Sequence, residues 1–156
     1  RTCEIAVRFA LPVSGAAYDF GSKFGTGPKE AVELLHQVAA RGWVPALCFH
    51  PGTQCEDEAA WVEYIHVARK IVDAADVSIA RLNVGGGFAA NRDGVAPDLE
   101  RVFDAIDAAA QQAFGAEKPE LICEPGRSMV SECFTLAARI KGIRQSGAVV
   151  FLNDGI

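Results

Sequence analysis

Short apolar runs alternate with amphipathic helical patterns along the whole chain, and this alternation restricts the possible folds more than any other feature. The apolar runs contain many β-branched residues and are too continuous for a sheet with one solvated face, so they predict buried strands. They occupy residues 4–9, 43–49, 79–84 and 120–123. The helical patterns occupy residues 27–42, 56–75 and 97–114. Pro28 suits the first turn of the first helix, and Gly42 suits its end.

Each predicted strand is followed by a loop with glycine or proline and then by a helix, which is a βα repeat and indicates an α/β fold. The strand ends recur at intervals of roughly 35 to 40 residues, about the size of one βα unit in an eightfold barrel. A doubly wound open sheet has the same local pattern, so periodicity alone leaves both architectures open. Residues 128–147 are compatible with a strand, a short helix or both. In either architecture the binding groups are expected in the loops that follow the strands.

Composition restricts the classes of function. The 156 residues are 50% hydrophobic and 22% charged, which is enough for one packed domain. The net charge of -5 argues against a nucleic-acid partner held on a basic face. No apolar run approaches the roughly 20 residues of a membrane span, so we expect no membrane segment. The cysteines are odd in number and lack CxxC spacing, which predicts reduced thiols in the cytoplasm and no disulfides.

Consecutive glycines follow the third predicted strand, in LNVGGGFAA (residues 82–90). Because Gly85, Gly86 and Gly87 lack side chains, their backbone can approach a ligand closely and their N–H groups can cradle a phosphate. The spacing does not fit GxGxxG, and the lysine and hydroxyl of a nucleoside-triphosphate loop are absent. From the glycines alone, a tight turn without a ligand is as good an explanation as a phosphate site.

His50 ends the second predicted strand, in CFHPGTQC (residues 48–55), and the hydroxyl of Thr53 follows it. A single histidine at such a position is more often a structural residue than a functional one. A neighbouring loop that could bind phosphate strengthens the case for a role in ligand binding.

A carboxylate, a rigid bend and a guanidinium lie together in LICEPGRSMV (residues 121–130). Glu124 follows a predicted buried strand, so a cationic partner would relieve the desolvation of its carboxylate. Arg127 could be that partner in a simple ion pair. Alternatively, Arg127 and the Gly126 N–H face a phosphate while Glu124 reaches a protonated ring nitrogen. Pyridoxal 5'-phosphate (PLP), with a phosphate at one end and a basic ring at the other, fits this second arrangement.

Short motifs that share one order and spacing run through the chain. They are SKFG at 22–25, FHPGTQ at 49–54, LNVGGGF at 82–88, CEPGR at 123–127 and LNDGI at 152–156. With these motifs the sequence resembles the ornithine/diaminopimelate/arginine decarboxylase family, which consists of PLP enzymes with an alanine-racemase-like barrel. The resemblance covers essentially the whole chain, and it implies a partial PLP-binding (β/α)8 barrel of the TIM type.

The resemblance assigns roles to the residues that match the family motifs. It implies that His50 stacks on the pyridine ring and that Glu124 bonds the ring nitrogen, which makes these two the expected catalytic residues. A carboxylate at that nitrogen favours the protonated ring and therefore decarboxylation, whereas related racemases place an arginine there. Thr53, in place of the usual serine, is expected to face the phosphate. The other expected cofactor-binding residues are Arg8, Gly85, Gly86, Gly87, Gly126 and Arg127.

The resemblance also implies that part of the active site lies outside this chain. Family members carry the Schiff-base lysine on an early barrel strand, and relatives contribute a cysteine and an aspartate across a dimer interface from a C-terminal β-domain. None of the lysines present stands in the lysine motif of the family; they are Lys23, Lys29, Lys70, Lys118 and Lys141. We therefore expect residues 1–152 to form a partial PLP-binding barrel domain and residues 153–156 to begin the β-domain. The full-length protein is expected to be a homodimer.

The LNDGI stretch is more similar to that of ornithine and lysine decarboxylases than to that of diaminopimelate decarboxylases. The expected reaction is therefore decarboxylation of a basic L-amino acid in polyamine biosynthesis, with ornithine (to putrescine) favoured over lysine (to cadaverine). Diaminopimelate decarboxylase stays an alternative. A catalytically inactive homologue that acts as a binding regulator, and an unrelated phosphate-binding barrel, also stay open. The intact set of His50, Glu124 and Arg127 argues against the regulator, and Glu124 would be unexplained in the unrelated barrel.

Overall fold

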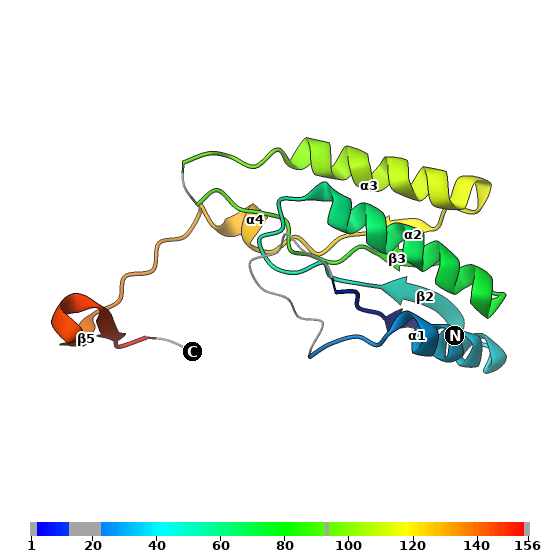
Figure 1. Cartoon of the computed structure of the whole chain (residues 1–156), viewed down its shortest axis with the longest axis horizontal. Coiled ribbons are helices and arrows are strands. Elements are labelled where there is room, and N and C mark those ends of the chain that lie inside the picture. The colour runs from blue at the N-terminus through cyan, green and yellow to red at the C-terminus, as the bar shows by residue number, and fades with distance from the viewer. Residues whose placement is uncertain (1–2, 13–22, 93, 155–156) are drawn as a thin grey trace.

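A parallel sheet with its strands in chain order forms the centre of the computed structural model, which describes residues 3–12, 23–92 and 94–154 (Figure 1). The strands are β1 (Glu4–Arg8), β2 (Val44–Cys48), β3 (Arg81–Asn83) and β4 (Glu120–Ile122). The helices that connect them are α1 (Pro28–Ala40), α2 (Glu58–Ala75) and α3 (Leu99–Phe114), the last followed by η1 (Gly115–Glu117). Ser22 of the SKFG motif, and Gly155 and Ile156 of the LNDGI motif, lie outside the described residues.

Aspartate caps determine where two of the helices begin. The carboxylate of Asp57 accepts a hydrogen bond from the N–H of Ala59 (3.0 Å), and the carboxylate of Asp98 accepts one from the N–H of Arg101 (3.1 Å). These caps satisfy backbone donors that have no partner inside the first turn of a helix. As a result, α2 begins at residue 58 rather than 56, and α3 begins at residue 99 rather than 97.

The strand order and the position of the helices distinguish a barrel from an open doubly wound sheet. β1 pairs with β2, β2 with β3 and β3 with β4, all in parallel. The helices form one layer, in which α1 packs against α2 and α2 against α3 (Figure 1). Right-handed crossovers that always advance in one direction place all helices on one face, whereas a doubly wound sheet reverses direction and has helices on both faces. The prediction of an α/β partial barrel is therefore confirmed for the described residues.

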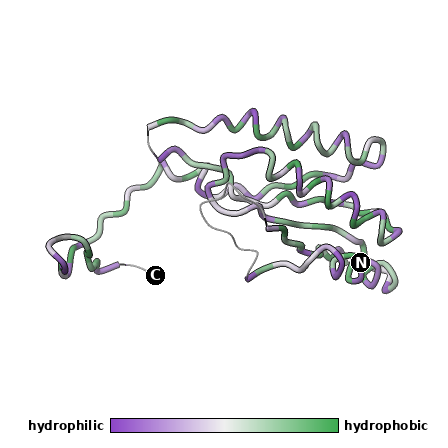
Figure 2. Tube along the Cα trace, viewed as in Figure 1, coloured by the Kyte–Doolittle hydropathy of each residue, from purple (hydrophilic) through white to green (hydrophobic). Residues whose placement is uncertain are grey.

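The hydrophobic core lies between the sheet and this helix layer. Hydrophilic and hydrophobic residues alternate along the helices, so each helix presents an apolar side to the strands (Figure 2). The central helix α2 contributes Trp61 and Tyr64, which are both fully buried. The Tyr64 ring stacks on Phe49 with ring centroids 4.5 Å apart, and the Trp61 ring stacks on Phe88 at 5.1 Å. These aromatic contacts connect α2 to the loops that follow β2 and β3.

The opposite face of the sheet is exposed at the edge strands β1 and β4, which corrects for these strands the prediction of cover on both sides, whereas Ala46 of β2 on the same face is 1% exposed. Glu4 and Ala6 of β1, and Glu120 and Ile122 of β4, are exposed. These side chains alternate along their strands with Ile5, Val7 and Leu121, which are buried or half-buried. They therefore point away from the helices, towards the inside of the barrel curve. Arg81 of β3 forms ion pairs across this face, at 2.8 Å to Glu4 and 2.7 Å to Glu120.

The segment after β4 contains both a short helix and strands, so both alternatives for residues 128–147 apply. It comprises α4 (Arg127–Val130), β5 (Ile140–Arg144), η2 (Gln145–Gly147) and β6 (Val149–Leu152). β5 and β6 pair antiparallel in a hairpin that stands apart from the parallel sheet (Figure 1). The domain boundary between residues 152 and 153 stays a prediction. Within the described part of the chain, no helix combines the length and apolar character needed to cross a membrane.

Candidate functional site

The loops that follow β2, β3 and β4 are held side by side because the pairing of the sheet continues past the ends of the strands. The N–H of Phe49 donates to the carbonyl of Asn83 (3.0 Å), and the N–H of Glu124 donates to the carbonyl of Gly85 (2.8 Å). A Cβ atom on Gly86 would lie 3.3 Å from Nε2 of His50 and 2.5 Å from the carbonyl oxygen of Glu124. The structure therefore brings His50 and the backbone of Glu124 to either side of the glycine loop.

Four polar side chains from three strand ends share this space. Arg8 is directly opposite Cys48 in the register of β1 and β2, and both Arg8 and Glu124 act electrostatically on Cys48 and on His50. Burial lowers the pKa of the His50 imidazole and Arg8 lowers it further, while Glu124 and a hydrogen bond to the backbone of His50 itself act in the opposite direction. Burial also raises the pKa of the Cys48 thiol. The environment of His50 therefore favours the neutral imidazole.

The tautomer of His50 follows from its backbone contact. The N–H of Gly52 donates to Nδ1 of His50 at 3.1 Å. This contact makes Nδ1 the acceptor and favours the neutral tautomer with its proton on Nε2, the nitrogen that would lie 3.3 Å from a Cβ built on Gly86.

Arg127 bonds to a neighbouring loop and not to Glu124. Its Nη2 donates a hydrogen bond to Oγ1 of Thr53, which joins the loop after β4 to the loop after β2. Among the described residues there is no ion pair between Glu124 and Arg127, so the simple ion-pair alternative is wrong. Glu124 is also exposed, so the expected cost of burying its carboxylate does not apply here. The guanidinium and the carboxylate are thus not paired with each other.

Neighbouring backbone atoms leave no room for a side chain at Gly85, Gly86 or Gly87. A Cβ on Gly85 would lie 2.2 Å from the carbonyl oxygen of Phe49, and a Cβ on Gly87 would lie 1.9 Å from that of Gly52. Both Gly85 (φ +72) and Gly87 (φ +87) also adopt left-handed backbone conformations. The sequence predicted glycine for the approach of a ligand, and the structure shows that it is needed for the approach of loops to one another.

The N–H groups of the glycine loop are not equivalent. The N–H of Gly85 donates to Oδ1 of Asn83 at 2.9 Å, so it is already used inside the loop. In the described part of the chain, the N–H groups of Gly86 and Gly87 have no hydrogen-bond acceptor. The N–H groups of Gly86 and Gly87 are therefore the ones left for a ligand in this loop, and the binding of a phosphate by Gly85, Gly86 and Gly87 stays a prediction.

Two residues that the sequence did not single out hold these loops in place. Asn83 fixes the start of the glycine loop, and the side chain of Gln54 bonds to the backbone of Ala90 in the loop after β3. The last residue of FHPGTQ was a possible signal for Gln54, but its partner lies 36 residues away and only the fold brings the two together.

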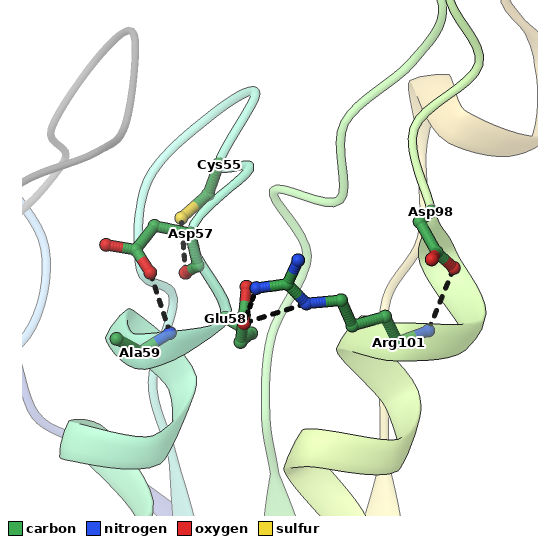
Figure 3. A network of polar contacts seen from close by, with 6 residues as sticks. All are labelled: Cys55, Asp57, Glu58, Ala59, Asp98 and Arg101. Atoms are coloured by element: carbon green, nitrogen blue, oxygen red, sulfur yellow. Dashed lines mark hydrogen bonds and ion pairs between the residues drawn. The ribbon is translucent and has the colours of Figure 1, made fainter.

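A separate pocket of about 780 Å³ lies on the outer side of the same loops. It is lined by Gln54 and the residues that lead into α2, and by the loop from Ala89 to the start of α3. It includes none of His50, Glu124 and Arg127. At this place Arg101 of α3 forms an ion pair with Glu58 of α2, next to the two aspartate caps and to the hydrogen bond from Cys55 Sγ to the Asp57 carbonyl (Figure 3). These contacts fix the two helices relative to each other, and we assign the pocket no ligand.

The donors and acceptors at the strand ends fit the two ends of PLP. At one end a guanidinium, a hydroxyl and unpaired backbone N–H groups suit a phosphate, and Arg127, Thr53, Gly86 and Gly87 supply them. At the other end the carboxylate of Glu124 suits a protonated ring nitrogen.

Comparisons with known proteins agree with this chemistry. Residues 2–131 match the family model described as "Pyridoxal-dependent decarboxylase, pyridoxal binding domain". A lysine/ornithine decarboxylase from Selenomonas ruminantium is 30% identical over 160 residues, which cover 98% of this chain and 40% of the relative. A chloroplastic ornithine decarboxylase from Nicotiana glauca is 35% identical over 163 residues, which cover 98% of this chain and 36% of the relative.

Solved structures give the same result for the fold. Diaminopimelate decarboxylase from Helicobacter pylori, complexed with L-lysine, superimposes with a TM-score of 0.75 at 25% identity. The match covers 99% of this chain and 41% of that chain. This chain therefore spans about two fifths of the length of the proteins that it resembles.

Proposed function

We propose that this chain, which belongs to the pyridoxal-dependent decarboxylase family, carries the cofactor-binding part of an enzyme that decarboxylates a basic L-amino acid. The observation that carries the proposal is the separation of the two charged groups of CEPGR. Arg127 bonds to Thr53, while Glu124 lies with His50 at the glycine loop. This arrangement supports a ligand with an anionic end and a cationic ring.

The phosphate end of the cofactor is bound by groups from three loops. Arg127 provides charge-assisted hydrogen bonds, Thr53 provides its hydroxyl, and Gly86 and Gly87 provide backbone N–H groups. Gly126, at the start of α4, contributes its backbone to the same region. In this proposal the phosphate binds these loops together, in addition to the contacts that they already make.

The ring end is controlled by Glu124 and His50. When bound, PLP supplies an electron sink for the negative charge that remains on the α-carbon after CO2 leaves. Glu124 holds a proton on the ring nitrogen by accepting its hydrogen bond, which strengthens the sink. His50 is kept neutral near pH 7 by burial and by Arg8, so it packs against the ring without adding a positive charge.

Ornithine is the proposed substrate, with lysine next, and putrescine or cadaverine is the corresponding product. The names of the relatives from Selenomonas ruminantium and Nicotiana glauca support these two substrates. The structural likeness to a diaminopimelate decarboxylase keeps that reaction as the second candidate. We further propose that the full-length protein is a homodimer, that it acts in polyamine biosynthesis and that it works in the cytoplasm. The relative named chloroplastic makes the plastid the alternative compartment.

The full-length protein with Glu124→Ala tests the proposal. We expect kcat to fall by about 100-fold or more, because the ring nitrogen loses the group that holds its proton, while the Kd for PLP changes by less than about fivefold. CO2 release with ornithine, lysine and diaminopimelate ranks the substrates by kcat/KM. Unchanged turnover in the variant contradicts the role of Glu124. A wild-type protein that shows no bound PLP and releases no CO2 supports the binding regulator instead.

A further inference from the structure

We infer that Gln54 is a positioning residue that sets the affinity for the phosphate end of the cofactor, by fixing the loop of Thr53 against the glycine loop. The inference rests on the proposed function and extends it to a residue that does not touch the ligand. Gln54 stands directly after Thr53 and belongs to the loop between β2 and α2.

The side chain of Gln54 pairs with both backbone groups of one residue in the next loop. Its Nε2 donates to the carbonyl oxygen of Ala90 at 2.6 Å, and its Oε1 accepts from the N–H of Ala90 at 3.2 Å. A primary amide is the side-chain group that offers a donor and an acceptor in this geometry. The Gln54 amide therefore satisfies both the N–H and the carbonyl of Ala90, as the backbone of a paired strand would.

Burial makes this pairing necessary. Ala90 is 7% exposed and Gln54 is half-buried, and both lie on the wall of the pocket beside α2 and α3, so this amide is the partner that the shielded backbone groups of Ala90 have within the protein. If the amide is removed, a buried N–H and a buried carbonyl lose their partners, which backbone groups in protein interiors rarely do. The two loops would lose the contact that joins them and would shift as water enters from the pocket.

The backbone around Gln54 transmits such a movement to the proposed phosphate site. Gln54 itself has a left-handed φ of 53, which is uncommon for a residue with a side chain. On one side of it, Thr53 accepts the hydrogen bond from Arg127. On the other side, the N–H of Cys55 donates to the carbonyl of Gly87 at 2.8 Å, and Cys55 forms a parallel bridge with Phe88. Gln54 thus sits between the proposed hydroxyl donor and one of the proposed N–H donors.

The ring end of the site is fixed by other contacts. His50 is held through the N–H of Gly52, and Glu124 is held through the carbonyl of Gly85. Neither contact involves Gln54 or Ala90. Loss of the Gln54 amide should therefore weaken binding of the phosphate and leave binding of the ring nearly unchanged.

The experiment compares two ligands that differ only in the phosphate. In the full-length protein, Kd is measured for PLP and for pyridoxal with the wild type, Gln54→Ala and Gln54→Glu. We expect Gln54→Ala to raise the Kd for PLP by about tenfold and the Kd for pyridoxal by less than about twofold. Gln54→Glu keeps an acceptor for the Ala90 N–H but loses the donor, so we expect an intermediate rise. Gln112→Ala, on the exposed side of α3, is the matched control with no expected change.

The outcomes separate the inference from the function on which it rests. An unchanged Kd for PLP in both Gln54 variants, or an equal rise for PLP and pyridoxal, overturns the positioning role. If Gln54→Ala does not fold, as judged by its thermal unfolding, the ratio of the two Kd values in Gln54→Glu decides. A wild-type protein that fails to bind PLP shows that the proposed function is wrong, and the positioning role fails with it.

Discussion

His50 lies between two groups of opposite charge, and their effects on its proton have opposite signs. Arg8 lowers its pKa and Glu124 raises it, while burial is the largest cause of the net decrease. We expect Arg8→Met to raise the pKa of His50 and Glu124→Gln to lower it further, as measured by NMR titration of the full-length protein. Lys70→Met, on the exposed side of α2, serves as a control. The same shift in both charge variants would contradict the assigned contacts.

The lowered pKa also fixes the direction of a stability effect. Because the folded state binds the proton of His50 more weakly than the unfolded state, the contribution of neutral His50 is complete above the ordinary pKa of about 6.5. It is lost as the pH falls from there through the lower folded value. The free energy of unfolding should therefore depend less on pH in this range when His50 is replaced by Gln.

Residue types in the loops could be read from the sequence, but their partners could not. His50, Glu124 and Arg127 were identified because they follow predicted strands and match the motifs of the decarboxylase family. The bond between Arg127 and Thr53 joins residues 74 positions apart, and it decides that Arg127 does not pair with Glu124. Such a choice depends on side-chain directions that no local pattern contains.

At the scale of elements, the glycine loop is the place where the fold and the site constrain each other most. A side chain on Gly85 would collide with the carbonyl of Phe49, and the positive φ of Gly85 adds strain for any other residue. We expect Gly85→Ala to lower the free energy of unfolding by about 2 to 4 kcal/mol, as measured by urea denaturation.

Gly142→Ala is the matched control for this effect. Gly142 lies in β5, and a Cβ there would come no nearer than 3.8 Å to the Phe151 ring. We expect this change to alter the free energy of unfolding by less than about 1 kcal/mol. A Gly85→Ala variant as stable as Gly142→Ala would mean that the loops after β2 and β3 are not packed as described.

The predicted elements are confirmed in type and order, and their ends differ by a few residues for identifiable reasons. Periodicity located α2, but the cap at Asp57 sets its first residue. The same apolar runs that located β1 and β4 also suggested burial on both faces, although Glu4 and Glu120 are exposed. The hydrophobicity of a strand indicates how much of it can be buried, but it does not show whether another element covers its second face.

At the scale of the whole chain, the decisive feature is that the long helices α1, α2 and α3 of the described residues lie on one side of the sheet. The proposed site lies on the other side, where Arg8, His50 and Glu124 stand at or just after the carboxyl ends of the strands. No lysine is found on β1, β2, β3 or β4; Lys29 and Lys70 lie on helices and Lys141 lies on β5. The lysine that binds the cofactor in the family is thus expected from another part of the full-length protein.

The isolated segment of residues 1–156 should therefore release no CO2 from ornithine, lysine or diaminopimelate in the presence of PLP. Far-UV circular dichroism verifies that the segment retains its helices under the assay conditions. Measurable CO2 release from a folded segment would show that the lysine has been misplaced.

The overall architecture was accessible from the sequence because a βα repeat has few ways to pack. Local patterns could not choose between a barrel and a doubly wound sheet, since Leu47 and Leu82 are buried against helices in either case. The choice depends on the direction in which each new strand is added, which only the completed pairing of β1 to β4 reveals.

The mutual fit of the loops has a consequence for engineering. The backbone of Gly87 lies against Gly52, and that of Gly86 lies against Glu124, so each loop is shaped to its neighbours. A chimera that takes only one of these segments from a relative will contain a loop whose shape does not match the loops beside it. Exchanging the segments after β2, β3 and β4 together should keep their backbone contacts. Substrate specificity could then be changed without loss of the fold.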